Sequence, residues 1–114
     1  MFVSKVDKKN FQSEVLESEK PVLVDFWGDR CPPCKIIARV LEELAVELEG
    51  KVKFAKLNVI QNQELAAQLG VRVIPTLWIF KHGEVADKLV GARQKSDISN
   101  WSCPLKTGQD QVSV

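Results

Sequence analysis

A continuous apolar run near the start of the chain limits the folds that this sequence can adopt. Residues 21–27, PVLVDFW, contain no charged residue except Asp25. A strand that is apolar on both of its faces is typical of the centre of a sheet that helices cover on both sides. Residues 53–59, KFAKLNV, are expected to form a second central strand. The two segments therefore predict a sheet buried within the domain.

The other patterned segments complete an alternating order of strands and helices. Strands are expected at residues 2–6, 75–80 and 84–90, and helices at residues 8–18, 34–49, 63–69 and from Ser96 to Cys103, which precedes a proline. Asp7 is expected to cap the first helix, and a turn at His82 and Gly83 joins the last two strands. Alternation followed by a hairpin predicts an α/β fold with a central mixed sheet flanked by helices on both faces.

The composition fits one globular domain, which we assign to residues 1–105, followed by a polar tail at residues 106–114. The 114 residues are 45% hydrophobic and 27% charged, with a net charge of +1 and no block of like charges. Nucleic acids and membrane surfaces favour basic patches, so neither is an expected partner. No apolar stretch is long enough for a signal peptide or a membrane span, and we expect a cytoplasmic protein.

Two of the three cysteines, Cys31 and Cys34, stand where the first central strand should give way to a helix. The free amides and the positive end of the dipole at a helix N-terminus favour a thiolate, which is the attacking species in disulfide exchange. Two intervening residues leave the sulfurs close enough to form a disulfide. Pro33 suits the first turn of the helix, where its missing N–H is not needed. The pair therefore predicts redox chemistry.

A metal site is the alternative for these cysteines. Cys31, Cys34, Cys103 and His82 together could supply four soft ligands. Zinc ligands normally come as two compact pairs, whereas Cys103 and His82 stand singly in unrelated segments. The spacing favours the redox hypothesis, and we expect no metal.

The sequence resembles the thioredoxin family over roughly residues 2–101. Six segments carry the resemblance in order and at the separations of the family: VLVDFW, CPPCK, AKLNV, VIPT, FKHGEV and VGA. The resemblance implies the thioredoxin fold and the activity of a protein-disulfide reductase. It also implies disulfide-containing protein substrates, a thioredoxin reductase or equivalent electron donor, a monomer, and no cofactor beyond a Cys31–Cys34 disulfide.

The resemblance also implies roles for four catalytic residues. Cys31 would attack the substrate disulfide and Cys34 would resolve the mixed disulfide. Asp25 would relay a proton to or from Cys34, which fits a carboxyl whose pKa is raised by burial. Lys56 would be the cationic neighbour of Asp25, although a lysine stem lying along the sheet margin is an alternative interpretation.

A substrate groove is implied around a cis proline at position 75. The expected substrate-binding residues are Arg30, Pro32, Pro33, Val73, Ile74, Pro75, Val90, Gly91 and Ala92. An extended substrate would add as a strand to the exposed edge beside Pro75. Arg30 stands where the family usually has tryptophan, and Pro32 and Val73 stand where it usually has glycine. A fourth difference is a last helix cut short by Cys103-Pro104. None of the four removes a chemical group that the reaction requires, but three alter what a partner touches.

A binding module is the second hypothesis. In that case the same groove would hold one specific partner while the cysteines remain idle. An insulin-reduction assay with dithiothreitol separates the two hypotheses, because a pure binder would not accelerate reduction. The presence of both cysteines and of Asp25 favours the enzyme.

Overall fold

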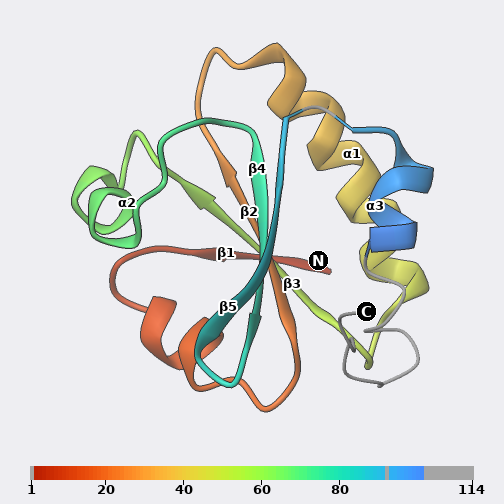
Figure 1. Ribbon diagram of the computed structural model, residues 1–114, viewed down its shortest axis with the longest axis horizontal. Helices are drawn as coiled ribbons and strands as arrows, with labels where there is room; N and C mark the ends of the chain where they lie inside the picture. The colour runs from red at the N-terminus through yellow and green to blue at the C-terminus, as the bar shows by residue number, and fades with distance from the viewer. Residues whose placement is uncertain (1, 92, 102–114) are drawn as a thin grey trace.

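The computed structural model describes residues 2–91 and 93–101, which form a mixed sheet with helices on both faces (Figure 1). The elements in chain order are β1 (Val3–Val6), η1 (Gln12–Leu16), β2 (Val22–Trp27), α1 (Pro32–Glu47), β3 (Lys53–Asn58), α2 (Gln63–Leu69), β4 (Thr76–Lys81), β5 (Glu84–Val90) and α3 (Lys95–Trp101). The strand order is β1-β3-β2-β4-β5. The predicted fold class, an α/β fold with a central mixed sheet flanked by helices on both faces, is confirmed.

The strand β2 lies at the centre of the sheet, as its apolar run predicts. It pairs in parallel with β3 and antiparallel with β4, and Val22 to Phe26 are all buried. Because side chains alternate along a strand, Leu23 and Asp25 point to one face, whereas Val24 and Phe26 point to the other. This alternation decides which helix each residue meets.

Two apolar clusters fill the space on the two faces of the sheet. One joins Leu23 to Leu41 and Leu44 of α1 and to Ile98 of α3. The other contains Phe26 and the residues Phe11, Val15, Val24, Ala55, Trp78 and Phe80, and it lies on the side of η1 and α2. Asp25 shares its face with Leu23, so this carboxyl points toward α1.

The first predicted helix, at residues 8–18, is wrong in its extent. Asp7 does accept hydrogen bonds from the N–H groups of Lys9 and Asn10, as a cap would. The regular part is only the five-residue π-helix η1. The hydroxyls of Ser13 and Ser18 donate to nearby carbonyls, and such local bonds compete with a regular helix.

The helix α1 begins two residues earlier than predicted. Cys31 is its N-cap in an extended conformation, and both Pro32 and Pro33 lie in its first turn. Prolines are tolerated there because the first N–H groups of a helix have no intrahelical partner. Cys34 therefore lies within the first turn rather than at the helix start.

The C-terminal half of the chain follows the prediction closely. The bounds of α2 and β5 are those expected, and Gly70 ends α2 in a left-handed conformation. The turn between β4 and β5 places His82 at φ 53° and Gly83 at φ 82°. Cys103, Pro104 and the predicted tail at 106–114 lie outside the described residues.

Candidate active site

The cysteines of the Cys-Pro-Pro-Cys segment form a disulfide at the start of α1. Their Cα atoms are 5.3 Å apart, and the Cys34 N–H donates to the Cys31 carbonyl at 3.0 Å. Cys31 is half-buried, whereas Cys34 is only 3% exposed. The loop that leaves β2 thus presents Cys31 nearer to solvent, and the helix turns Cys34 into the domain.

Asp25 is buried beneath this helix. Its side chain is almost fully removed from solvent, and its Oδ1 atom has no hydrogen-bond partner within the described part of the chain. Burial raises the pKa of Asp25 from 3.8 to about 7, against a smaller lowering by the charge of Lys56. A carboxyl with such a pKa can gain or lose a proton near neutral pH.

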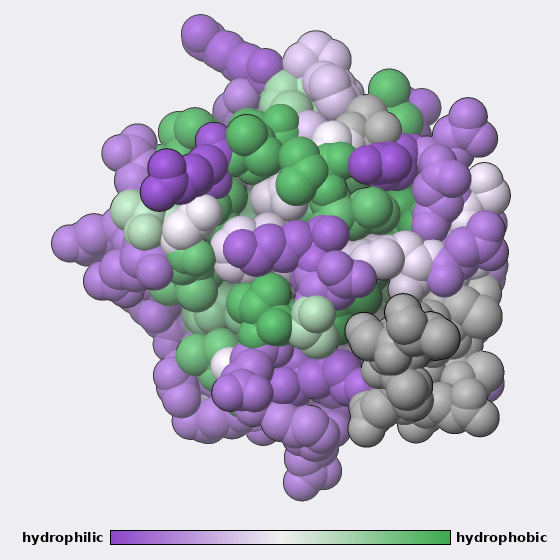
Figure 2. Space-filling view, in the orientation of Figure 1, coloured by the Kyte–Doolittle hydropathy of each residue, from purple (hydrophilic) through white to green (hydrophobic). Residues whose placement is uncertain are grey.

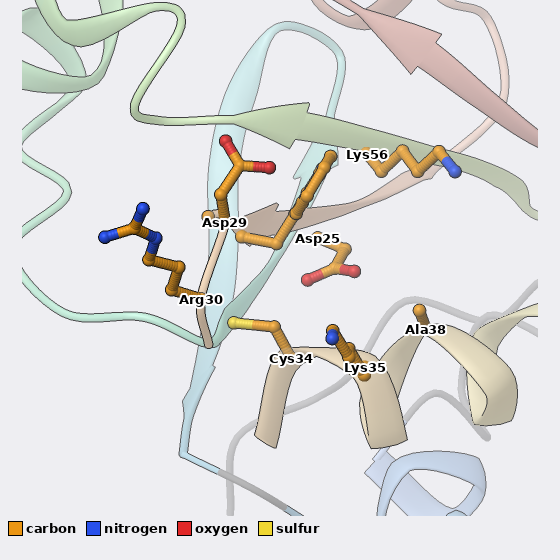
Figure 3. Close-up of a pocket in the computed structure, with 9 residues that line it drawn as sticks. Asp25, Asp29, Arg30, Cys34, Lys35, Ala38 and Lys56 are labelled. Atoms are coloured by element: carbon orange, nitrogen blue, oxygen red, sulfur yellow. The ribbon is translucent and has the colours of Figure 1, made fainter. Parts of the chain in front are cut away.

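A cavity of about 270 Å³ connects Asp25 with Cys34 (Figure 3). Its lining residues are Asp25, Trp27, Gly28, Asp29, Arg30, Cys34, Lys35, Ala38 and Lys56. Figure 3 shows the Asp25 carboxylate directed toward α1. A cavity of this size has room for water, and the polar groups of its wall can bind it. Asp25 and Cys34 therefore line one shared space with room for water.

Three cationic side chains border the cavity. Lys56 pairs with Asp25 in the parallel register of β2 and β3, although its ammonium group extends away from the carboxylate in Figure 3. Lys35 follows Cys34 in α1. Arg30 has a left-handed backbone conformation, with φ 61°, and its guanidinium group points away from Cys34. The sequence analysis did not single out Lys35.

The expected groove residues meet beside the cysteine loop. The Ile74–Pro75 peptide bond is cis, and the pairing of Phe26 with Thr76 places Pro75 next to the carboxyl end of β2. The Gly91 N–H donates to the Pro75 carbonyl at 2.9 Å.

Several of these residues are open to solvent. Pro32 and Pro33 are exposed in the first turn of α1, and Val73 and Val90 are each about half exposed. An apolar surface around Pro75 therefore remains available to a partner. Ala92, the last predicted groove residue, lies outside the described residues.

The loop from Asn58 to Asn62 belongs to the same end of the sheet, and sequence reasoning missed it. Its Ile60 is 51% exposed, although Asn58 and Asn62 on either side are buried. A signal was present, because Ile60 places an apolar side chain in the short connection between the strand predicted at residues 53–59 and the helix predicted at residues 63–69. Trp27 at the end of β2, which its position near the cysteines predicts to pack beneath the cysteine loop, has its Nε1 atom buried without a partner among the described residues.

His82 does not join the cysteines. It lies in the turn at the end of β4 remote from Pro75, and Cys103 lies outside the described residues. Within residues 2–91 and 93–101, no group of three or more His, Cys, Asp or Glu residues could hold a metal ion. In the same part of the chain, none of the helices has the length and apolar character needed to cross a membrane.

A mixed sheet of this topology, with a disulfide-bonded cysteine pair at the start of the helix after β2, defines a thiol–disulfide oxidoreductase. The thioredoxin family model matches residues 2–102. A thioredoxin of Rickettsia bellii is 45% identical over 98 residues, which cover 86% of this chain and 93% of the relative. A thioredoxin of Chlorobaculum thiosulfatiphilum is 52% identical over 91 residues, covering 80% and 84%. A thioredoxin of Haemophilus influenzae is 49% identical over 96 residues, covering 84% and 90%. The chain belongs to the thioredoxin family.

Proposed function

We propose that this protein reduces disulfides in other proteins through the Cys31–Cys34 pair. The observation that carries the proposal is the pairing of a half-buried and a buried sulfur in one disulfide at a helix N-terminus. In the reduced protein the Cys31 thiolate attacks one sulfur of the substrate disulfide. A mixed disulfide forms, and the other substrate sulfur leaves as a thiolate.

The second step releases the substrate. Cys34 loses its proton and attacks the sulfur of Cys31, which breaks the mixed disulfide and frees the second substrate thiol. The substrate has then gained two electrons, and the protein holds the Cys31–Cys34 disulfide. Asp25 accepts the proton of Cys34 through the cavity that the two side chains share, and its pKa of about 7 supports this role. Lys56 favours the charged carboxylate that makes Asp25 a base.

The substrate lies along the groove beside Pro75. An extended segment adds next to Val73 and Ile74, and its apolar side chains contact Val90 and Gly91. Pro32 and Pro33 form the floor next to Cys31, and Arg30 borders it on the loop side. The exposure of Val73 and Val90 supports this placement, because exposed apolar residues that lie together favour a binding surface.

The oxidised protein must be reduced again before another turnover. A thioredoxin reductase, or another donor of two electrons and two protons, performs that step. We infer that the protein acts as a monomer in the cytoplasm. Its net charge of +1, without a block of like charges, favours partners other than nucleic acid.

Insulin reduction by dithiothreitol tests the proposal. The wild-type protein should accelerate precipitation of the insulin chains, and Cys31→Ser should not. Iodoacetamide at neutral pH should label Cys31 before Cys34 in the reduced protein. A folded wild-type protein that gives no acceleration would identify a binding module instead, and faster labelling of Cys34 would reverse the two roles.

A further inference from the structure

An exposed isoleucine borders the proposed groove on the side opposite Val90. Ile60 lies in the connection between β3 and α2, and half of its side chain is open to solvent. Figure 2 shows apolar surface in the upper half of the molecule, the half in which β4 begins and β5 ends. Ile60 is thus an exposed apolar residue at this end of the sheet that the family resemblance does not imply.

Ile60 packs directly against the loop that carries the cysteines. A methyl group at Gly28 would lie 2.9 Å from Cδ1 of Ile74 and 3.2 Å from Cγ1 of Ile60. The missing side chain at Gly28 therefore lets both isoleucines approach its backbone. Ile60 and Ile74 therefore both lie against Gly28 and form one apolar wall on the loop that leads to Cys31, which is three residues further along the chain.

Buried asparagines hold the loop of Ile60 in place. The Oδ1 atom of Asn58 accepts hydrogen bonds from the N–H groups of Ile60, at 2.9 Å, and Gln61, at 3.2 Å. Asn62 donates to the Asn58 carbonyl at 3.0 Å. The Asn58 side chain also donates to Asp29 at 3.4 Å, which links this loop to the cysteine loop. Ile60 is thus fixed by its backbone while its side chain remains uncovered.

A fixed, exposed apolar side chain is suited to binding. Water contact with apolar surface is unfavourable, and burying it against a partner recovers free energy in proportion to the area. Because the loop is already ordered, little conformational entropy is lost when a partner contacts Ile60. The substrate must bring its disulfide to Cys31, so the residues next to its cysteine must pass over this wall.

We propose that Ile60 is a specificity residue that selects substrates with an apolar side chain beside the reducible cysteine. This inference rests on the proposed function and adds a preference to it. The side chain of the substrate residue packs between Ile60 and Ile74, above Gly28. A polar side chain at the same place loses water without gaining a partner, because both residues of the wall are apolar.

The test compares peptides that differ in one residue. The peptide disulfides differ at the residue directly before or directly after the cysteine, which is either Leu or Ser. Hydroxyethyl disulfide serves as a small substrate without side chains. Wild-type protein should prefer Leu over Ser in kcat/KM at one position. Ile60→Ala should lower kcat/KM for that Leu peptide roughly tenfold, the range for lost apolar contacts in a pocket. The kcat/KM of Ile60→Ala for the Ser peptide and for the small disulfide should differ from that of wild type by less than twofold.

Two further variants control this result. Ile60→Leu should retain the preference, because it restores the apolar wall. Val46→Ala truncates a similarly exposed apolar side chain, which is 53% exposed on α1. It should leave kcat/KM for all three substrates unchanged. An equal fall for all three substrates with Ile60→Ala, or an unchanged Leu-to-Ser ratio, would overturn the specificity role alone. If wild-type protein reduces none of the substrates, the proposed function is wrong, and the inference is wrong with it.

Discussion

Two non-glycine residues of the described chain have a positive φ, and they lie at opposite ends of the sheet. His82 has φ 53° in the turn between β4 and β5, whereas Arg30 has φ 61° just before Cys31. At the turn, His82 and Gly83 are both left-handed, which suits the twist of two antiparallel strands joined by a two-residue loop. A methyl group at Gly83 would also lie 3.0 Å from the Leu16 carbonyl. The strain at His82 is thus required by the hairpin.

No hairpin requires the conformation of Arg30. Other unfavourable features lie at the same end of the sheet: the buried carboxyl of Asp25, the Nε1 atom of Trp27, which has no partner among the described residues, and the exposed side chain of Ile60. Each of these features is unfavourable for the stability of the folded protein, and such exceptions are expected at functional sites. The conformation of the hairpin end is therefore required by the fold, whereas that of the Arg30 end is better explained by function.

Substitution of a cysteine should give the largest difference in turnover between variants at the two ends of the sheet. Cys34→Ser should lose repeated turnover and accumulate a mixed disulfide at Cys31, because no second thiol remains to release the substrate. Mass spectrometry of the protein after incubation with a disulfide substrate measures this adduct. His82→Ala, at the other end, should retain full turnover. Repeated turnover by Cys34→Ser would contradict the two-step exchange.

Asp25→Asn should give the largest change in stability. Folding raises the pKa of Asp25 from 3.8 to about 7, so the folded state keeps a proton that the unfolded state releases. The free energy of unfolding therefore falls as the pH rises from about 4 to about 7, by roughly 4 kcal/mol in total. Asp25→Asn lacks this fall, so it should be more stable than wild type above pH 7 by up to that amount. Urea unfolding of the oxidised protein at several pH values measures it.

The control for this prediction is Glu42→Gln on α1. Its carboxyl is exposed, so the variant should keep the pH dependence of wild type. Turnover gives an independent measurement, because loss of a proton acceptor typically slows a reaction by at least roughly a hundredfold. A wild-type pH slope in Asp25→Asn would show that Asp25 does not cause the pH dependence, and unchanged turnover would show that it is not the proton acceptor.

The sequence predicted most of the fold because its patterns reflect burial. The apolar run of β2 and the turn signal at His82 and Gly83 depend on local chemistry that sequence displays directly. The helix at residues 8–18 was predicted wrongly because Ser13 and Ser18 bind nearby carbonyls, a competition that periodicity does not reveal.

The candidate site could be predicted only where the type of a single residue, in its sequence context, indicates the chemistry. Cys31, Cys34 and Asp25 stand out because thiols at close spacing and an acid in an apolar run are rare. Ile60 did not stand out, because its importance depends on contacts with Gly28, more than 30 residues away in the chain. Contacts between distant segments are properties of the folded chain, and one sequence does not reveal them.

Asparagine substitutions at His82 and Arg30 should separate backbone strain that the hairpin requires from backbone strain at the candidate active site. Asparagine adopts the left-handed conformation more readily than histidine or arginine, so His82→Asn and Arg30→Asn should each raise the free energy of unfolding by up to about 1 kcal/mol. Only Arg30→Asn should alter the rate at which iodoacetamide labels Cys31. Chemical denaturation and labelling kinetics measure the two effects. A change in Cys31 labelling in His82→Asn would contradict the separation of the two ends.

The charge of Arg30 should have the smallest effect. A cation beside Cys31 stabilises its thiolate, hence the reduced protein, and so makes the protein slightly less reducing. The guanidinium group is exposed and points away from Cys34, so water screens it. An exposed charge contributes roughly up to 1 kcal/mol, which corresponds to about 20 mV in a two-electron couple.

Arg30→Gln should therefore lower the redox potential by no more than about 20 mV and raise the pKa of Cys31. Equilibration with a glutathione buffer measures the potential, and the pH dependence of labelling measures the pKa. Arg30→Lys keeps the charge and should retain both values of wild type. If Arg30→Gln raises the potential or leaves the pKa of Cys31 unchanged, electrostatics is not the reason for an arginine at this position. Its left-handed backbone and its place at the rim of the groove would then indicate a role in substrate contact.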